Sequence, residues 1–160
     1  MKHWLLVSLL ALAPLAHAAD LPADTAPQGT QPYDEHADAQ AQVKQALAAG
    51  KRAHKPTLLV FGANWCGDCR ALDASLHTEQ NAALVAQHFE VVKIDVGNFD
   101  RNLELDQAYG HPIAKGIPAA VVISPAGKLV YATRAGELAN ARKMSDQGIY
   151  DFFARVAAAP

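Results

Sequence analysis

The chain has 160 residues, a formal net charge of −2 and 51% hydrophobic residues. A chain of this length can build one domain with its own core and is too short for two of ordinary size. Lysine and arginine are mixed with aspartate and glutamate along the chain and do not form blocks. No segment has the basic surface that a phosphate backbone requires, so the sequence argues against a nucleic-acid partner.

The first 18 residues have the pattern of an export signal. Lys2 is followed by the apolar run WLLVSLLALA and then by Ala16-His17-Ala18, with small residues where signal peptidase cleaves. The apolar run is shorter than the about 20 residues that a spanning helix needs. The sequence therefore predicts a signal peptide at residues 1–18. The mature protein is predicted to be periplasmic or secreted, without a membrane span.

A leader and a helix precede the first predicted strand. Residues 19–33 are rich in proline, alanine, threonine and glutamine, which is typical of a flexible segment. The domain itself is predicted at residues 34–160. It opens with an alanine-rich helix that starts at Asp34, a residue type that caps helix N-termini, and stops at Gly50, a residue type that ends helices.

The two cysteines of the chain follow the first predicted strand. Residues 56–61 include a continuous apolar run, which indicates a strand buried on both faces. From Cys66 onward the apolar residues recur with helical spacing. Cys66 therefore falls at a helix N-terminus, where free N–H groups and the helix dipole favour a thiolate. Cys69 lies one turn inside and is expected to be more sheltered.

The remainder of the chain alternates between short strands and helices. Proline and glycine in the segment SPAG (Ser124–Gly127) suit a type I turn, so the residues after it should return as an antiparallel strand. Apolar patterns predict strands at 89–96, 119–124 and 128–136, and helices at 101–110 and around 149–156.

A cysteine pair two residues apart has few uses in an exported protein. Two cysteines in an oxidising compartment usually form a structural bridge. A bridge that encloses two residues closes too short a loop to stabilise a fold much. Zinc needs four ligands, but the chain has no second cysteine pair and only scattered histidines. The pattern favours a redox couple, with the exposed cysteine first and the sheltered one second.

The segment WCGDC after a buried strand, with GIP at residues 116–118 before another strand, resembles the thioredoxin superfamily. The resemblance covers roughly residues 56–136. It implies an α/β fold with a central mixed four-stranded sheet flanked by helices. By the same resemblance, Cys66 is the attacking thiolate and Cys69 the resolving thiol, and the enzyme is a protein-disulfide oxidoreductase.

The resemblance also assigns residues that shape the site. The Ile117–Pro118 bond is cis in this family, and its loop packs against the cysteine pair. Trp65 would shield the site and present a flat apolar surface to a substrate, the alternative being an ordinary core aromatic. Gly67 and Asp68 lie between the cysteines.

The resemblance further implies the partners and the redox group. The substrates would be disulfide-containing proteins, and a membrane thiol reductant or oxidant would recharge the pair. The Cys66–Cys69 disulfide would itself be the redox group, with no other cofactor and no metal.

Three features depart from the family pattern. Thioredoxins carry a buried aspartate six residues before the first cysteine, where this chain has Val60, so the base for Cys69 is not identified. Asp68 stands where thioredoxin has proline. The segment HPIA adds His111 before the GIP loop; this histidine either tunes the site or is simply solvated.

Asp68 bears on the direction of electron flow. The helix dipole stabilises a thiolate by up to about 1 kcal/mol. A carboxylate ~6 Å away costs about 0.7 kcal/mol in water and nearly 3 kcal/mol at an effective dielectric of about 20. Asp68 can therefore cancel the dipole. Because a less stabilised thiolate gives a more reducing couple, the sequence favours a reductase.

Two alternatives from other classes stay open. The chain could be a peptide-binding module on a thioredoxin scaffold, with idle cysteines and extended peptides held by strand pairing beside Pro118. The pair could also bind a soft metal such as copper(I), with His111 as a third ligand.

Overall fold

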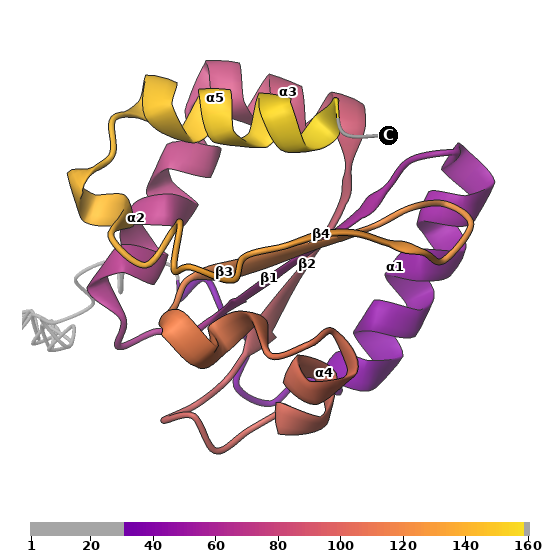
Figure 1. The fold of residues 1–160 in the computed structure, drawn as a ribbon, viewed down its shortest axis with the longest axis horizontal. Helices are drawn as coiled ribbons and strands as arrows, with labels where there is room; N and C mark the ends of the chain where they lie inside the picture. The colour runs from indigo at the N-terminus through magenta and orange to yellow at the C-terminus, as the bar shows by residue number, and fades with distance from the viewer. Residues whose placement is uncertain (1–30, 159–160) are drawn as a thin grey trace, which may run out of the picture.

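The structure is a computed structural model that describes residues 31–158. The predicted signal peptide and residues 19–30 of the predicted leader lie outside these residues. Figure 1 shows the arrangement of the elements. In chain order these are α1 (Ala39–Ala53), β1 (Thr57–Gly62), α2 (Gly67–Leu76), α3 (Glu79–His88), β2 (Glu90–Asp95), α4 (Leu103–Ala108), the 3₁₀ turn η1 (Pro112–Lys115), β3 (Ala119–Ile123), β4 (Leu129–Ala132), the 3₁₀ turn η2 (Ala141–Lys143) and α5 (Asp146–Ala157).

The four strands form one mixed sheet in the order β2-β1-β3-β4. β1 runs parallel to β2 and antiparallel to β3, and β4 returns antiparallel beside β3. In the turn between β3 and β4, the Gly127 N–H donates to the Ser124 carbonyl at 2.8 Å, as the SPAG segment predicts. The predicted mixed four-stranded α/β fold is confirmed.

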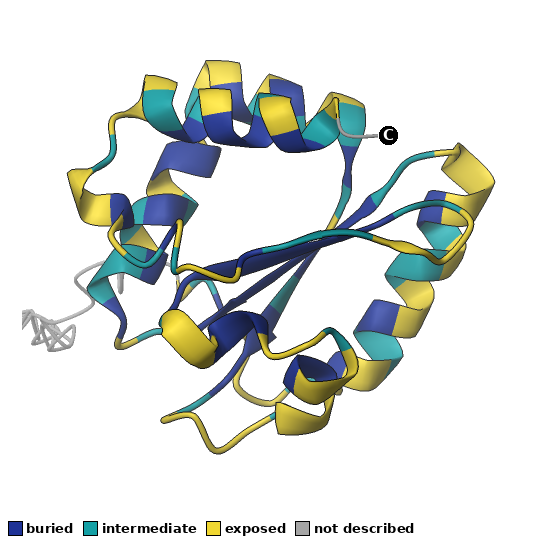
Figure 2. Ribbon diagram, in the orientation of Figure 1, coloured by how far each residue is buried: buried dark blue, intermediate teal, exposed yellow. Residues whose placement is uncertain are grey.

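Helices cover both faces of the sheet, with α2, α3 and α5 on one side and α1 and α4 on the other (Figure 1). Every residue of β1 is buried. Leu58 and Val60 pack in the core below α2, α3 and α5, whereas Leu59 and Phe61 pack in the core below α1 and α4. The helix sides that face the sheet are buried and the outer sides are exposed (Figure 2). Packing on both faces holds β1 in place. The cysteine motif follows directly after the C-terminal end of this strand.

The first helix differs from its prediction at both ends. Asp38, not Asp34, caps it: the Asp38 carboxylate accepts the Ala41 N–H at 2.9 Å. The helix continues through Gly50 and ends at Ala53. Gly50 is buried, and a Cβ there would lie 2.7 Å from the Lys55 carbonyl oxygen. This glycine allows a close approach of the backbone and does not end the helix.

The helix predicted after Cys66 is interrupted, and two helices connect β1 to β2. α2 ends at Leu76 and α3 begins at Glu79. Two side chains bond to a backbone carbonyl in the last turn of α2. The Thr78 hydroxyl donates to the Ser75 carbonyl at 2.8 Å, and the Asn81 side-chain amide donates to the same carbonyl at 2.9 Å. Threonine and asparagine side chains that bond to the backbone in this way compete with helix continuation.

Tyr33, the last residue of the predicted leader, belongs to the core. Its side chain is buried, and it packs in the same cluster as both cysteines. The Tyr33 N–H donates to the Asn64 side-chain oxygen at 3.0 Å, and the Asn64 amide donates back to the Tyr33 carbonyl at 2.8 Å. The first described residues are therefore tied to the loop that leads into the cysteine motif.

Candidate active site

Cys66 and Cys69 form a disulfide with their Cα atoms 5.2 Å apart. Cys66 immediately precedes α2, and Cys69 lies in its first turn. Cys66 is 5% exposed and Cys69 is 0% exposed. Cys66 is the more exposed of the two, as predicted, but it is itself buried and not an exposed residue. A substrate sulfur can therefore approach this pair only at Cys66.

The Cys66 sulfur lies at the N-terminal end of α2. The backbone before the helix is extended, and the sulfur accepts the Cys69 N–H at 3.1 Å. The other free N–H groups of the first turn add a partial positive charge at the same end. In the reduced protein this position favours a Cys66 thiolate over a thiol.

The loop before β3 lies against this sulfur. The Ile117–Pro118 peptide bond is cis, and the Ile117 carbonyl oxygen lies 3.6 Å from the Cys66 sulfur. Asp106 of α4 holds the preceding turn, because its carboxylate accepts the Ile113 N–H at 3.1 Å. The resemblance implied such a contact between the loop and the pair, and here the backbone of Ile117 makes it.

Trp65 is 54% exposed and is not an ordinary core aromatic. Its indole N–H donates to the Gly97 carbonyl at 2.8 Å, which fixes the ring over the loop that follows β2. The ring meets Phe99 of that loop edge-on, with centroids 6.1 Å apart. An apolar face therefore stands directly beside Cys66.

Asp68 is paired with a cation. One carboxylate oxygen accepts the Arg142 backbone N–H at 2.9 Å, and the other lies 3.1 Å from the Arg142 guanidinium. Burial raises the pKa of Asp68, but the hydrogen bonds and the charge of Arg142 outweigh it and hold that pKa below its usual value. Asp68 is therefore ionised at neutral pH, as expected, and is compensated, which the sequence did not indicate.

Arg142 also lies against the other residue between the cysteines. A Cβ at Gly67 would come within 3.2 Å of the Arg142 guanidinium. Both a carboxylate and a guanidinium therefore border the Gly67–Asp68 segment. The repulsion of a Cys66 thiolate by Asp68, expected for an isolated charge, is opposed by this cation. The repulsion of the thiolate by Asp68 therefore no longer supports a reductase by itself.

Opposite shifts of the Cys66 pKa are expected when either member of the pair is removed. Arg142→Gln leaves Asp68 uncompensated and should raise the Cys66 pKa, whereas Asp68→Asn leaves Arg142 uncompensated and should lower it. Each shift should be about half a pKa unit, because Arg142 is largely exposed and water screens its charge. The thiolate ultraviolet absorbance of reduced protein, with Cys69 replaced by serine, measures the pKa.

The double variant Asp68→Asn/Arg142→Gln is the control and should titrate close to the parent. High salt should reduce both single shifts, since the pair is partly exposed. Shifts of the same sign in the two single variants would show that the pair acts by holding the start of α2 and not through its charges.

Val60 gives Cys69 no base. It is buried in the core below α5, whereas the cysteines belong to the core on the other face of the sheet. The Tyr33 hydroxyl and the Cys69 sulfur both border Gly62: a Cβ at this glycine would overlap the hydroxyl and lie 3.0 Å from the sulfur. Burial, together with the charges of two aspartates, raises the pKa of Tyr33. Its hydroxyl keeps its proton and cannot act as the base.

His111 bonds to the residue that holds the proline loop. Its ring nitrogen lies 2.9 Å from the Asp106 carboxylate, and its side chain is 63% exposed. Any tuning of the pair by His111 would act through Asp106 and the loop. Among residues 31–158, no three histidine, cysteine, aspartate or glutamate side chains cluster where they could hold a metal. The copper alternative therefore lacks a third ligand of these types in the described chain.

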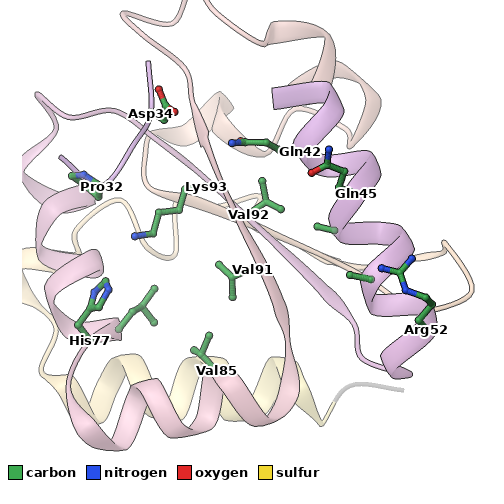
Figure 3. A pocket seen from close by; sticks show the side chains of 13 residues that line it. Pro32, Asp34, Gln42, Gln45, Arg52, His77, Val85, Val91, Val92 and Lys93 are labelled. Atoms are coloured by element: carbon green, nitrogen blue, oxygen red, sulfur yellow. The ribbon is translucent and has the colours of Figure 1, made fainter. Parts of the chain in front are cut away.

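A groove of about 880 Å³ lies elsewhere, along the edge strand β2 between α1 and α3 (Figure 3). Val91, Val92 and Lys93 of β2 form its floor, and Gln42 and Gln45 of α1 form one wall. Neither cysteine lines it. The groove is therefore separate from the disulfide.

A family model described as thioredoxin-like matches residues 38–125, which is more than half of the chain. The chain belongs to the thioredoxin-like family. No curated protein matches it. Within the described part of this thioredoxin-like protein, no helix is both long and apolar enough to cross a bilayer.

Solved structures agree with this family. A protein described as a disulphide isomerase from Xylella fastidiosa Temecula1 is 77% identical, with 78% of this chain and 95% of that chain covered and a TM-score of 0.78. The reduced C-terminal domain of DsbD from Neisseria meningitidis is 22% identical and has a TM-score of 0.50. The match covers 72% of this chain and 95% of that domain. A thioredoxin from Thermus thermophilus is 19% identical and has a TM-score of 0.51. The match covers 71% of this chain and 79% of that thioredoxin. The last two show the fold alone.

Three residues of this thioredoxin-like site were missed from the sequence. Arg142 follows Asp68 by 74 positions, in the short 3₁₀ turn η2, whose charged residues look like ordinary surface in the sequence. Tyr33 is one aromatic residue at the end of a polar segment, and Phe99 is one aromatic residue in a predicted loop. No periodicity or motif marks any of them. Only the folded chain brings them to the cysteine motif.

Proposed function

We propose that this protein is a thiol–disulfide oxidoreductase that reduces and rearranges disulfides of exported proteins. The observation that carries the proposal is the Cys66–Cys69 disulfide at the start of α2, with the Cys66 sulfur against the Ile117–Pro118 loop. The 77% identical protein from Xylella fastidiosa is described as a disulphide isomerase, which supports exchange on protein substrates. We propose no cofactor or metal beyond the disulfide itself.

Reduction begins with the dithiol form of the pair. The Cys66 thiolate attacks one sulfur of a substrate disulfide, whose S–S bond breaks as the Cys66–substrate bond forms. The second substrate sulfur leaves as a thiolate and takes up a proton. Cys69 then loses its proton and attacks the Cys66 sulfur, which releases the substrate as a dithiol. Two electrons have passed to the substrate, and the Cys66–Cys69 disulfide has formed.

Rearrangement uses the same first step. If a second substrate thiol attacks the mixed disulfide before Cys69 does, the substrate leaves with a different disulfide and the pair stays reduced. Both reactions require reduced Cys66. We therefore propose that a membrane thiol reductant returns two electrons to the pair, which makes the protein a reductase overall.

Export is part of the proposal, and it predicts where the mature chain begins. The signal pattern at residues 1–18 places the new N-terminus at Ala19 or Asp20. Mass spectrometry of the intact protein purified from its native host should find this mass. An intact Met1 on most of the protein would contradict export.

A trapping experiment tests the proposed function. In Cys69→Ala the resolving thiol is absent, so the mixed disulfide between Cys66 and a substrate should accumulate in the periplasm. Non-reducing electrophoresis should show adducts that a reductant releases, and mass spectrometry of them identifies the substrates. Cys66→Ala, which lacks the attacking sulfur, is the matched control. Absence of adducts in Cys69→Ala, or equal adducts in both variants, would contradict the proposal.

A further inference from the structure

A buried carboxylate of α4 is bonded to the turn that leads into the loop of Ile117 and Pro118. Asp106 is 7% exposed. One of its carboxylate oxygens accepts the Ile113 N–H at 3.1 Å, and the other lies 2.9 Å from a ring nitrogen of His111. Burying a carboxylate is costly unless its oxygens are bonded, and these two contacts bond both of them. The Asp106 side chain therefore fastens residues 111–113 to α4.

His111 adopts a backbone conformation that is unfavourable at this place in the chain. Its φ is 59° and its ψ is 54°, in the left-handed region that is uncommon for a residue with a Cβ. The next residue is Pro112, and the residue before a proline is normally extended. Such a turn keeps its shape only where surrounding contacts hold it. The two carboxylate contacts of Asp106 do so, together with its carbonyl, which accepts the His111 N–H at 2.8 Å.

The turn continues directly into the residue whose carbonyl faces Cys66. The Ile113 side chain is buried in the same cluster as both cysteines. The Ile113 carbonyl accepts the Gly116 N–H at 2.9 Å, so η1 closes immediately before Ile117. The Ile117 carbonyl oxygen then lies 3.6 Å from the Cys66 sulfur. A displacement of Ile113 would therefore be passed on to this contact.

The Ile117 carbonyl interacts differently with the two protonation states of Cys66. In the reduced protein, a thiol at this position can donate its proton to the carbonyl oxygen in a weak hydrogen bond. A thiolate has no proton to donate, and the negative end of the carbonyl dipole repels it. A carbonyl held close to the sulfur therefore favours the thiol.

We propose that Asp106 is a positioning residue, which holds the Ile117 carbonyl against Cys66 and thereby limits how readily Cys66 ionises. Asp106 acts through the turn at residues 111–113 and does not itself touch the reacting sulfur atoms. This inference rests on the proposed function and assigns a residue that regulates the reactivity of its attacking sulfur.

Removal of the Asp106 side chain tests the inference. In Asp106→Ala both side-chain contacts with residues 111–113 are lost, so the loop should move away from Cys66 and the Cys66 pKa should fall by about half a unit. The thiolate ultraviolet absorbance of reduced protein, with Cys69 replaced by serine in every variant, measures this pKa. If Asp106→Ala does not fold, His111→Gly takes its place. Glycine adopts the φ of His111 without strain but lacks the ring that contacts Asp106, so the Cys66 pKa should again fall.

Asp106→Asn separates the position of the loop from the charge of the carboxylate. Asparagine has nearly the same size, keeps an oxygen that accepts the Ile113 N–H and has an amide that can bond to the His111 ring. The Cys66 pKa of this variant should stay close to that of the parent. A fall as large as in Asp106→Ala would show that Asp106 acts through its charge and would overturn the inference.

Asn81→Ala is the control for a general loss of stability. Asn81 is 1% exposed, and its amide donates to the Ser75 carbonyl in the last turn of α2, whereas the cysteines lie at the start of that helix. This variant should be destabilised and should keep the Cys66 pKa of the parent. A fall equal to that in Asp106→Ala would count against a positioning role. So would an unchanged or higher pKa in folded Asp106→Ala, or in His111→Gly where it takes its place.

Insulin reduction separates this inference from the proposed function, because the titration needs no substrate. A lower Cys66 pKa in Asp106→Ala, without insulin reduction by the parent, would support the positioning role and contradict the enzyme. Insulin reduction by the parent, with equal Cys66 pKa values in the parent and Asp106→Ala, would support the enzyme and contradict the positioning role.

Discussion

Replacing Cys66 with serine is expected to abolish reduction of insulin disulfides, leaving only the background rate of the added dithiol. A hydroxyl cannot form a disulfide, and at neutral pH it is almost fully protonated, so the first step of exchange has no nucleophile. Cys69→Ser should still form the mixed disulfide and then resolve it slowly with thiol from solution. The turbidity of precipitating insulin chains measures both rates.

The fold should survive the Cys66 substitution. The Cys66 sulfur accepts the Cys69 N–H at the start of α2, and serine is a preferred residue for this capping role. The disulfide that is lost encloses two residues and contributes little stability. Circular dichroism should therefore give a melting temperature close to that of the parent. If the parent itself reduced insulin no faster than the dithiol background, and so no faster than folded Cys66→Ser, the result would instead favour the peptide-binding alternative, with idle cysteines.

The largest loss of stability is expected from Phe153→Ala, about 3–5 kcal/mol in the free energy of unfolding. Phe153 is 1% exposed and lies between Phe89 and Phe152, with ring centroids 6.5 Å and 5.0 Å away. Truncation removes the buried ring and leaves a cavity between α5 and the sheet. Urea denaturation, monitored by circular dichroism, measures the loss as a lower urea concentration at the midpoint of unfolding.

Phe99→Ala is the matched control, since it removes the same ring from an exposed position. Its free energy of unfolding should change by less than about 0.5 kcal/mol. Phe153 packs on the face of the sheet opposite to the cysteines, so Phe153→Ala should keep its insulin activity at temperatures where it is folded. A destabilisation below about 1 kcal/mol would contradict the packing of α5 against the sheet.

The parts of the fold that neighbouring residues determine could be predicted from the sequence. The run Leu58–Phe61 is apolar at every position, and such a run is stable only when both of its faces are covered. The change to helical spacing after Cys66 placed this cysteine at a helix start, where the free N–H groups lie regardless of the rest of the fold. The resemblance carried by WCGDC and GIP then supplied the sheet and the proline loop.

Element ends were predicted less well, because several residues satisfy the same local rule. Asp34 and Asp38 are equally suitable caps by type, and the structure uses Asp38 while Tyr33 enters the core. Gly50 is a residue type that often ends helices, yet here it lies inside α1 and makes room for the Lys55 carbonyl that approaches it. Tertiary packing chose between these options, and local propensity could not.

The surroundings of the cysteines were decided by the tertiary structure. From the sequence, Asp68 is a lone carboxylate in the first turn of a helix, and its repulsion of a thiolate follows from that position alone. The fold brings Arg142 from 74 residues away to pair with it, and brings Phe99 beside Trp65. Charge and dispersion act through space over a few ångströms, whereas sequence patterns report only neighbours along the chain. The sequence by itself predicted which two sulfur atoms pair, and the folded chain determined the charges and the apolar side chains that surround them.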